Sequence, residues 1–257
     1  MTTGSGFSPH LVTRFVADLD RQVRSLIDGQ LVATILHGSA ALGRFVPGRS
    51  DVDVLMLVDS PDLAAGVLQS IAERFHAVTD RCPGAGLEIS VVAAGAAADP
   101  GPPWPYLLHV TTQADDPRTV FGRDGDGVPD LLMHDAVCRS AGIAVTGPLR
   151  STAIGEIRRS EVLDYLRHEL AWAGENADTT YGVLNACRAW QFVTTGELAS
   201  KLDGASWAIR SGGPEAVITA AVSAQTDGGD GPPRLEADEL MGAVDSIIEE
   251  AIAQLQR

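Results

Sequence analysis

The chain has 257 residues, of which 34 are acidic and 19 are basic, so its formal net charge at pH 7 is −15. Residues 1–150 carry 11 basic and 17 acidic side chains, and residues 151–257 carry 8 and 17. Because neither half is basic, the composition argues against a partner that is nucleic acid or an anionic membrane. Two interpretations stay open: a solubilising acidic surface, or a carboxylate-lined cleft that attracts a small polycation.

The cysteines and the first residues bear on the cellular compartment. Cys82, Cys138 and Cys187 are far apart and in no metal-binding spacing, which is typical of buried thiols in a reducing environment. Residues 1–6 include neither a basic nor an apolar stretch, so we expect no signal peptide. No apolar run is long enough to predict a membrane span. We therefore expect a cytoplasmic protein, and we expect a monomer.

The first part of the chain mixes helix and strand signals. Apolar residues at helical spacing predict three helices, at 10–27, 61–78 and 130–141. Continuous apolar runs predict four strands, at 31–36, 51–58, 87–92 and 106–111. We expect a short helical stretch between Gly38 and Phe45, and a loop rich in Gly, Ala and Pro after the third strand.

Beyond residue 155 the strand signals disappear. Helical spacing predicts four further helices, at about 157–173, 180–195, 214–225 and 236–255. With 45% apolar residues, both parts of the chain can bury a core. The sequence therefore predicts an α+β domain over residues 1–150 and an all-α domain over residues 151–257.

Two aspartates lie on one predicted strand, in the sequence Asp51-Val52-Asp53-Val54. Alternation along a strand places Asp51 and Asp53 on the same face. Neighbouring carboxylates repel each other unless something compensates, and Mg²⁺, which prefers oxygen ligands, would do so. On its own the pattern also fits a solvated strand edge. With the residues around it, we expect Asp51 and Asp53 to hold Mg²⁺.

Gly38 and Ser39 stand where the first predicted strand runs into a helix, and eleven residues separate Ser39 from Asp51. A glycine there lets a phosphate approach the backbone, and free N–H groups and a hydroxyl bind anions. Ser50, directly before Asp51, adds a second hydroxyl. These three residues are therefore candidates for contacts to the phosphates of a nucleotide.

Glu88 lies within the apolar run Leu87-Glu88-Ile89 of the third predicted strand. A lone charge there is costly unless it is paired or belongs to a site. If this strand lies beside that of Asp51 and Asp53, three carboxylates converge. Such a group suits metal-assisted attack of a hydroxyl on a nucleotide α-phosphate, in which Glu88 deprotonates the hydroxyl or completes the metal site.

Together these residues resemble the nucleotidyltransferases of the polymerase-β-like superfamily, whose pattern is Gly-Ser, a variable spacer and Asp-x-Asp. A finer resemblance is to the aminoglycoside adenylyltransferases that inactivate streptomycin and spectinomycin. Segments of the second half match that family in order and spacing: Val183-Leu184-Asn185, Arg188-Ala189-Trp190, Thr195-Gly196, Lys201 and Ser206-Trp207-Ala208. The likeness extends over residues 30–210. It implies a mixed sheet with helices, followed by a helical-bundle domain.

The resemblance also implies an activity and roles for individual residues. It implies that AMP moves from ATP, with Mg²⁺ on the two aspartates, to a hydroxyl of a cationic antibiotic, which confers resistance. The two serines would contact the triphosphate, and Glu88 stands where the family has its catalytic base. Arg188 and Lys201 match an arginine and a lysine that contact the phosphates. Asp178 matches an aspartate that contacts the drug, although a helix cap is its other interpretation.

Two departures from the family keep other functions open. Residues 106–130 contain no tryptophan to pack on a drug, and residues 223–225 contain no tyrosine to lie near adenine. A nucleotidyltransferase acting on another small hydroxyl metabolite or on a protein is one alternative. A nucleotide- or drug-binding module without turnover is another.

Several aromatic and histidine side chains are expected to be structural. Trp172, Trp190 and Trp207 lie in predicted helices of the second part, where core packing is their expected role. His37 precedes Gly38 and is expected to pack at the strand end. No partner can be assigned from the sequence to His109 or His134, so we expect structural roles for both.

Overall fold

The structure is a computed structural model that describes residues 9–114, 117–122, 127, 130–148 and 150–257. The chain divides into two compact units, Met1–Ile157 (unit 1) and Arg158–Arg257 (unit 2). Helix α6 (Arg150–Ala153) therefore belongs to unit 1. Within the described ranges, no helix combines the length and the apolar character needed to cross a bilayer.

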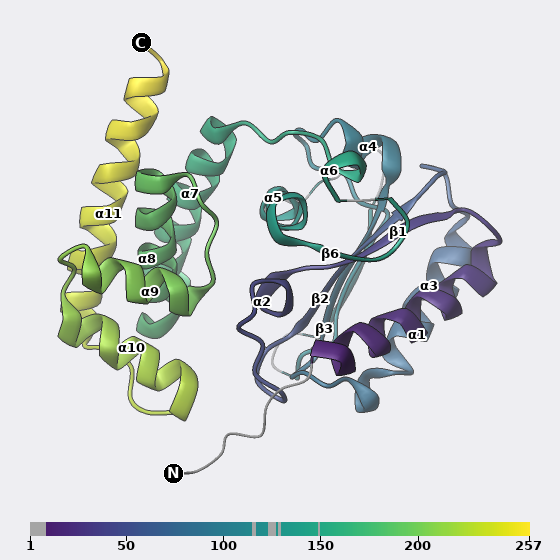
Figure 1. The fold of residues 1–257 in the computed structure, drawn as a ribbon, viewed down its shortest axis with the longest axis horizontal. Helices are drawn as coiled ribbons and strands as arrows, with labels where there is room; N and C mark the ends of the chain where they lie inside the picture. The colour runs from purple at the N-terminus through teal and green to yellow at the C-terminus, as the bar shows by residue number, and fades with distance from the viewer. Residues whose placement is uncertain (1–8, 115–116, 123–126, 128–129, 149) are drawn as a thin grey trace. The chain divides into compact units, whose positions relative to one another are not determined.

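A six-stranded sheet of described residues forms the centre of unit 1 (Figure 1). Its strands, in spatial order, are β5 (Arg118–Phe121), β4 (Leu108–Thr111), β3 (Leu87–Ala93), β2 (Val52–Val58), β1 (Leu31–Leu36) and β6 (Ile143–Thr146). β2 and β3 run parallel, and the other neighbouring pairs are antiparallel. The parallel pair is central, so both of its strands are flanked by further strands.

Helices α1 (Pro9–Ile27) and α3 (Ala65–His76) cover one face of this sheet (Figure 1). Their apolar side chains pack on alternate strand residues, because successive side chains of a strand point to opposite faces. The core on this side includes Leu19, Ile71, Phe75, Val54 and Ile89. Burial of this stripe explains the helical spacing of apolar residues in α1 and α3.

The opposite face of the central strands is more polar. Because Val54 and Ile89 point into the core on the α1 side, Asp53, Glu88 and Ser90 point to the other side. Four helices of unit 1 contribute no described residue to the α1 core: α4 (Ala94–Ala98), α5 (Leu131–Ala141), α6 and the short 3₁₀ helix η1 (Thr79–Arg81). Helix α2 (Gly38–Ala41) reaches that core only through Ala40. Helix α2 also contacts both β2 and α5.

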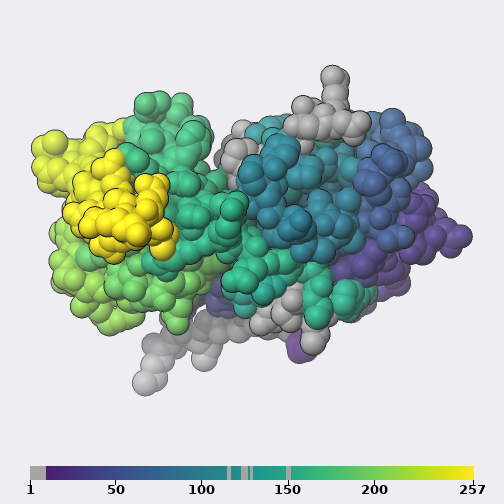
Figure 2. All heavy atoms as spheres, turned by 90° about the horizontal axis from the view of Figure 1, so that it is seen from above, coloured from purple at the N-terminus to yellow at the C-terminus, as the bar shows by residue number. Residues whose placement is uncertain are grey.

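Unit 2, which is described throughout, contains only helices. They are α7 (Arg159–Asn176), α8 (Thr179–Thr195), α9 (Lys201–Arg210), α10 (Glu215–Asp227) and α11 (Arg234–Leu255). Helix α8 contacts the other four, and eight of its residues are buried. It is therefore the central helix of the unit. The last turns of α11, yellow in Figure 2, lie on the surface, where Leu255 is exposed.

The long elements predicted from the sequence are confirmed, and several shorter ones were missed. The edge strand β5 is exposed at all four residues, so it shows no alternation of apolar and polar positions. β6 has only four residues and follows α5 after a single glycine, Gly142. Helix α9 contains Gly204, which packs against the backbone of Arg188, so its helical signal is weak. The predicted loop after β3 also contains the short helix α4.

A buried polar network ties α1 to the sheet. Oδ1 of Asp20 accepts hydrogen bonds from the hydroxyls of Thr34 on β1 (2.7 Å) and Thr146 on β6 (2.6 Å). Oδ2 accepts from Arg24 Nε at 2.7 Å. Although burial raises the pKa of Asp20, these hydrogen bonds outweigh it and hold that pKa below its usual value. The ionised carboxylate therefore stabilises the fold.

We predict that Asp20→Asn lowers the free energy of unfolding by about 2 kcal/mol near neutral pH, because an amide cannot accept from all three donors. Urea unfolding would measure this. The native pKa is lowered, so the contribution is present above the unfolded pKa and is lost as pH falls through the native pKa. The difference between the proteins should therefore shrink in acid.

The matched control is Asp18→Asn. Asp18 also pairs with an arginine of α1, Arg21, but both side chains are largely exposed. Exposed pairs contribute little, so we expect a change below about 0.5 kcal/mol. Equal losses in the two variants would contradict a specific role for the buried network.

Candidate active site

The three predicted carboxylates gather at the start of the central parallel strands. Asp53 on β2 and Glu88 on β3 are register partners, so their side chains project side by side from the same face of the sheet. Asp51 stands immediately before β2, two residues from Asp53. The negative charges of both Asp51 and Glu88 act on Asp53. The tertiary structure thus joins residues that are more than thirty positions apart in the sequence.

Gly38 lies directly against the Asp53 carboxylate. Its φ is +57°, and a Cβ at this position would stand 1.8 Å from Asp53 Oδ2. The backbone N–H of His37 donates to the Asp53 carbonyl at 2.9 Å, and the backbone N–H of Ser39 donates to the Asp53 carboxylate. Only glycine combines this backbone conformation with so close an approach. The turn after β1 is therefore built around Asp53.

The charge state of Asp53 depends on its surroundings. Burial raises its pKa to about 8, and the negative charges of Glu88 and Asp51 contribute to the rise. Without a cation, this carboxyl group therefore holds a proton at neutral pH. A cation bound at Asp51 and Asp53 would favour the ionised form instead.

The oxygen donors of Asp51 and Asp53 suit Mg²⁺. Among the described residues, no three His, Cys, Asp or Glu side chains are grouped so that they could hold one ion by themselves. Mg²⁺ commonly takes one or two carboxylates, and phosphate oxygens and water complete its shell. The pair therefore fits a metal ion that arrives with a nucleotide.

Glu88 has an ion-pair partner on α5. Its Oε1 lies 3.3 Å from His134 Nε2, and the Glu88 side chain is 27% exposed. Burial alone would raise the pKa of Glu88, but the hydrogen bond from His134 and the charges of nearby histidines hold it well below its usual range. Burial lowers the pKa of His134, but Glu88 outweighs this and raises it above its usual value. At neutral pH the pair is a carboxylate beside an imidazolium.

Two more histidines surround this pair. The ring centroid of His37 lies 5.0 Å from that of His134, and the centroid of His109 lies 6.4 Å from it. Burial lowers the pKa of His37 to about 3, and the charge of His134 contributes, so His37 is neutral. Burial also lowers the pKa of His109. The sequence assigned no partner to His109 or His134, whereas in the structure all three histidines act on Glu88.

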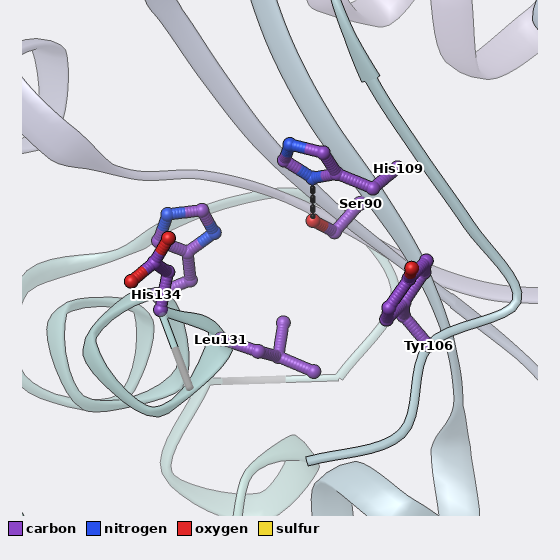
Figure 3. A pocket seen from close by; sticks show the side chains of 6 residues that line it. Ser90, Tyr106, His109, Leu131 and His134 are labelled. Atoms are coloured by element: carbon purple, nitrogen blue, oxygen red, sulfur yellow. Dashed lines mark hydrogen bonds between the residues drawn. The ribbon is translucent and has the colours of Figure 1, made fainter. Parts of the chain in front are cut away.

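His134, the partner of Glu88, also lines a small pocket (Figure 3). Ser90, two residues after Glu88 on the same face of β3, has its hydroxyl 3.0 Å from His109 Nδ1. The ring of Tyr106 stands edge-on to His109, with the centroids 6.4 Å apart. The residues that line the pocket are Ser90, Tyr106, His109, Asp130, Leu131 and His134.

The two predicted phosphate-binding serines differ in their hydrogen bonds. The hydroxyl oxygen of Ser39 is buried and has no hydrogen-bond partner within the described part of the chain. The hydroxyl of Ser50 accepts from the Val46 N–H at 3.0 Å, and the Ser50 N–H donates to the Val46 carbonyl at 2.8 Å. Ser50 therefore closes a tight turn, while its hydroxyl proton can still be donated.

In unit 2 the three predicted residues lie around Tyr181. Asp178 is the N-cap of α8, and its Oδ1 accepts from the Tyr181 backbone N–H at 2.7 Å, so the cap interpretation is confirmed. Nζ of Lys201 lies 4.3 Å from the centroid of the Tyr181 ring. Arg188 follows Tyr181 by two turns of α8, and its charge acts on the phenol. The fold thus brings Asp178, Arg188 and Lys201 to one region of unit 2.

Tyr181 itself is held by α7. Its hydroxyl donates to Glu169, and the ring of Trp172 stands edge-on to it, with the centroids 6.0 Å apart. Trp172 is 46% exposed, so the prediction that it is a core residue is wrong. Trp190 and Trp207 instead pack on each other, with centroids 5.3 Å apart.

Sequence reasoning missed His134 and Tyr181. One signal for His134 was present: it lies on the helical stripe with Leu131 and Cys138, both of which are buried. A titratable residue on a buried stripe needs a partner. For Tyr181 no comparable signal exists, because its neighbours come from three helices that only the fold of unit 2 brings together.

Comparisons with known proteins agree with this architecture. Residues 154–250 match the family model described as aminoglycoside adenylyltransferase, C-terminal domain. Spectinomycin 9-adenylyltransferases of Staphylococcus aureus strains Mu50 and N315 are each 27% identical over 198 residues, which cover 73% of this chain and 74% of theirs. A crystal structure of a spectinomycin adenyltransferase from Enterococcus faecialis with ATP and spectinomycin has a TM-score of 0.69 at 14% identity, covering 92% of this chain and 99% of that one. The predicted α+β fold with a helical C-terminal part is confirmed.

The raised pKa of Asp53 generates a stability prediction. Its native pKa lies above its unfolded pKa, so its contribution to stability is greatest in acid and is lost as pH rises from about 4 to about 8. In Asp53→Asn the side chain cannot ionise, so this loss of stability at high pH disappears. The amide oxygen can still accept a hydrogen bond from the Ser39 N–H. Without divalent cations, the variant should be more stable than the unmodified protein by about 2 kcal/mol at pH 8, and by less at pH 5.

Chemical denaturation at the two pH values, with EDTA present, would measure the difference. Asp59→Asn, on an exposed residue just after β2, is the control and should change stability little at either pH. An Asp53→Asn protein that is less stable at pH 8 would show that the carboxylate is not electrostatically strained.

Proposed function

Because this chain belongs to the aminoglycoside adenylyltransferase family, we propose that it transfers AMP from ATP to a hydroxyl of an aminoglycoside or aminocyclitol antibiotic of the streptomycin or spectinomycin type. Such a transfer would confer resistance. The observation that carries the proposal is the register pairing of Asp53 with Glu88, beside Asp51 and the Gly38 turn. This arrangement supports the assignment of Asp51 and Asp53 to the metal ion and of Glu88 to the base.

The reaction would proceed by direct displacement at the α-phosphate. The acceptor hydroxyl gives its proton to Glu88, and its oxygen forms a bond to the α-phosphorus. The bond from that phosphorus to the bridging oxygen of the β-phosphate breaks, and pyrophosphate leaves. Because the His134 hydrogen bond keeps Glu88 ionised, this carboxylate is ready to accept a proton at neutral pH.

Asp51 and Asp53 are the residues that would hold Mg²⁺. The bound ion would neutralise charge on the triphosphate and on the leaving pyrophosphate. Burial and its acidic neighbours keep Asp53 protonated when no cation is bound. The pair therefore needs a cation such as Mg²⁺ before both carboxylates can be ionised.

Several polar groups are suited to the phosphates of ATP. We assign this role to the Gly38 turn and to the hydroxyls of Ser39 and Ser50 in unit 1. The buried Ser39 hydroxyl supports the assignment, since it has no hydrogen-bond partner among the described residues. We assign the same role to Arg188 and Lys201 in unit 2, which both lie near Tyr181.

Acidic groups are suited to a cationic antibiotic. Glu88 would accept a hydrogen bond from the reacting hydroxyl. Asp178 would contact an ammonium or guanidinium group, because only its Oδ1 has a described hydrogen bond within α8 and its side chain is exposed. The net charge of −15 favours the approach of such a cation.

The absence of tryptophan between residues 106 and 130 favours one alternative, another small hydroxyl metabolite or a protein as the acceptor. A binding module without turnover is disfavoured by the three adjacent carboxylates. A pyrophosphate-release assay with each acceptor in turn separates these functions, because it measures whether turnover occurs with that acceptor.

We predict that spectinomycin or streptomycin causes this protein to release pyrophosphate from ATP, and that Glu88→Gln lowers kcat by roughly 100-fold or more. A coupled pyrophosphate assay would measure both. Glu73→Gln, on an exposed residue of α3, is the control and should keep full activity. If neither drug is modified, a screen of other hydroxyl compounds tests the alternative acceptors, and full activity of Glu88→Gln would exclude Glu88 as the base.

We predict that Lys201→Ala weakens ATP binding about tenfold, because an ammonium on a phosphate is lost. Isothermal titration with a non-hydrolysable ATP analogue would measure the change. The control is Arg210→Ala, which removes an exposed cation from the other end of α9. Equal affinities for unmodified protein and Lys201→Ala would assign Lys201 to packing on Tyr181 alone.

A further inference from the structure

We infer that His134 is a positioning residue that orients Glu88 for proton abstraction, an assignment that rests on the proposed function. Its Nε2–H donates to Oε1 of Glu88 at 3.3 Å. That bond occupies one carboxylate oxygen and leaves Oε2 for the acceptor hydroxyl. A base must hold its accepting atom within hydrogen-bond reach of the proton, so the orientation of this carboxylate bears directly on kcat.

Glu88 needs such a partner because of its neighbour in the sheet. Asp53 is its register partner on β2, and the two carboxyl groups project from the same face. When Asp53 gives up its proton, repulsion between the two carboxylates favours rotamers in which Glu88 turns away from Asp53. The hydrogen bond from α5 opposes that rotation and fixes the carboxylate between β2 and α5.

His134 is itself held in place on several sides. It lies in the second turn of α5, a helix of eleven residues, between the buried positions Leu131 and Cys138. The ring of His37, which is 3% exposed, packs 5.0 Å from its ring. The ring centroid of His109, which is hydrogen-bonded to Ser90, lies 6.4 Å from that of His134. An imidazole confined in this way directs its Nε2–H at a fixed point.

In this arrangement His134 orients the base, whereas Glu88 accepts the proton. Figure 3 shows that His134 and His109 project toward the same pocket from two elements, α5 and β4. Only His134 has a described contact with Glu88. His134 therefore acts through Glu88 and need not touch the acceptor.

We predict that His134→Leu lowers kcat about 30-fold while the KM for ATP changes less than about twofold, because the variant loses the donor but keeps the nucleotide contacts. His134→Gln places an amide N–H near the position of Nε2, so it should restore kcat to within about threefold of the unmodified protein. Steady-state kinetics with ATP and the preferred drug, together with melting temperatures for each variant, would measure this.

The control is His168→Leu, which removes an exposed histidine from α7 and should leave the kinetics unchanged. If Leu and Gln variants lose kcat equally, or if neither loses it, the positioning role is wrong. A loss that follows the melting temperatures of the variants would likewise assign His134 to stability alone. Absence of turnover in the unmodified protein would overturn the proposed function and this inference with it, whereas turnover insensitive to both variants would overturn only the inference.

Discussion

The parallel pairing of β2 with β3 sets the electrostatics of unit 1. Its register puts Asp53 beside Glu88, with Asp51 just before the strand, so negative charge accumulates at one end of two buried strands. The alternate residues of both strands belong to the apolar core under α1 and α3, so neither strand can shift by one position without burying its carboxylates there. The same packing that stabilises the sheet therefore concentrates the carboxylates on its other face.

The structure compensates this charge in two different ways. Glu88 receives a hydrogen bond and positive charge from His134, so its carboxylate stays ionised. The charge of His134 and the hydrogen bond from the Ser39 N–H favour the ionised form of Asp53, but burial and two acidic neighbours outweigh them and keep it protonated. In the proposed reaction Glu88 would accept a proton, and Asp53 would exchange its proton for a cation. Their environments, rather than their residue types, separate the two roles.

Several residues that we assign to ligand binding also stabilise the local structure of their own unit. Gly38 is required because the turn after β1 lies against Asp53. Asp178 caps α8, and Lys201 packs over the ring of Tyr181. Because each residue stabilises the element that carries it, its substitution affects both local structure and ligand contacts. Measurements that separate stability from affinity or turnover are therefore needed at these positions.

The sequence by itself determined the long elements and the acidic core of the site. Helical and strand periodicities are local, so they predicted α1, β1 to β4 and the main helices of unit 2, and they placed Asp51 and Asp53 on one predicted strand.

The tertiary structure decided the remaining elements and the partners of the site residues. The strand β5 is exposed and short, and α9 is a short helix that contains Gly204, so their local signals are weak. The partnership of Glu88 with His134 joins β3 to α5 across more than forty residues, and the environment of Tyr181 comes from three helices. Such contacts depend on packing between distant segments, which no local pattern encodes.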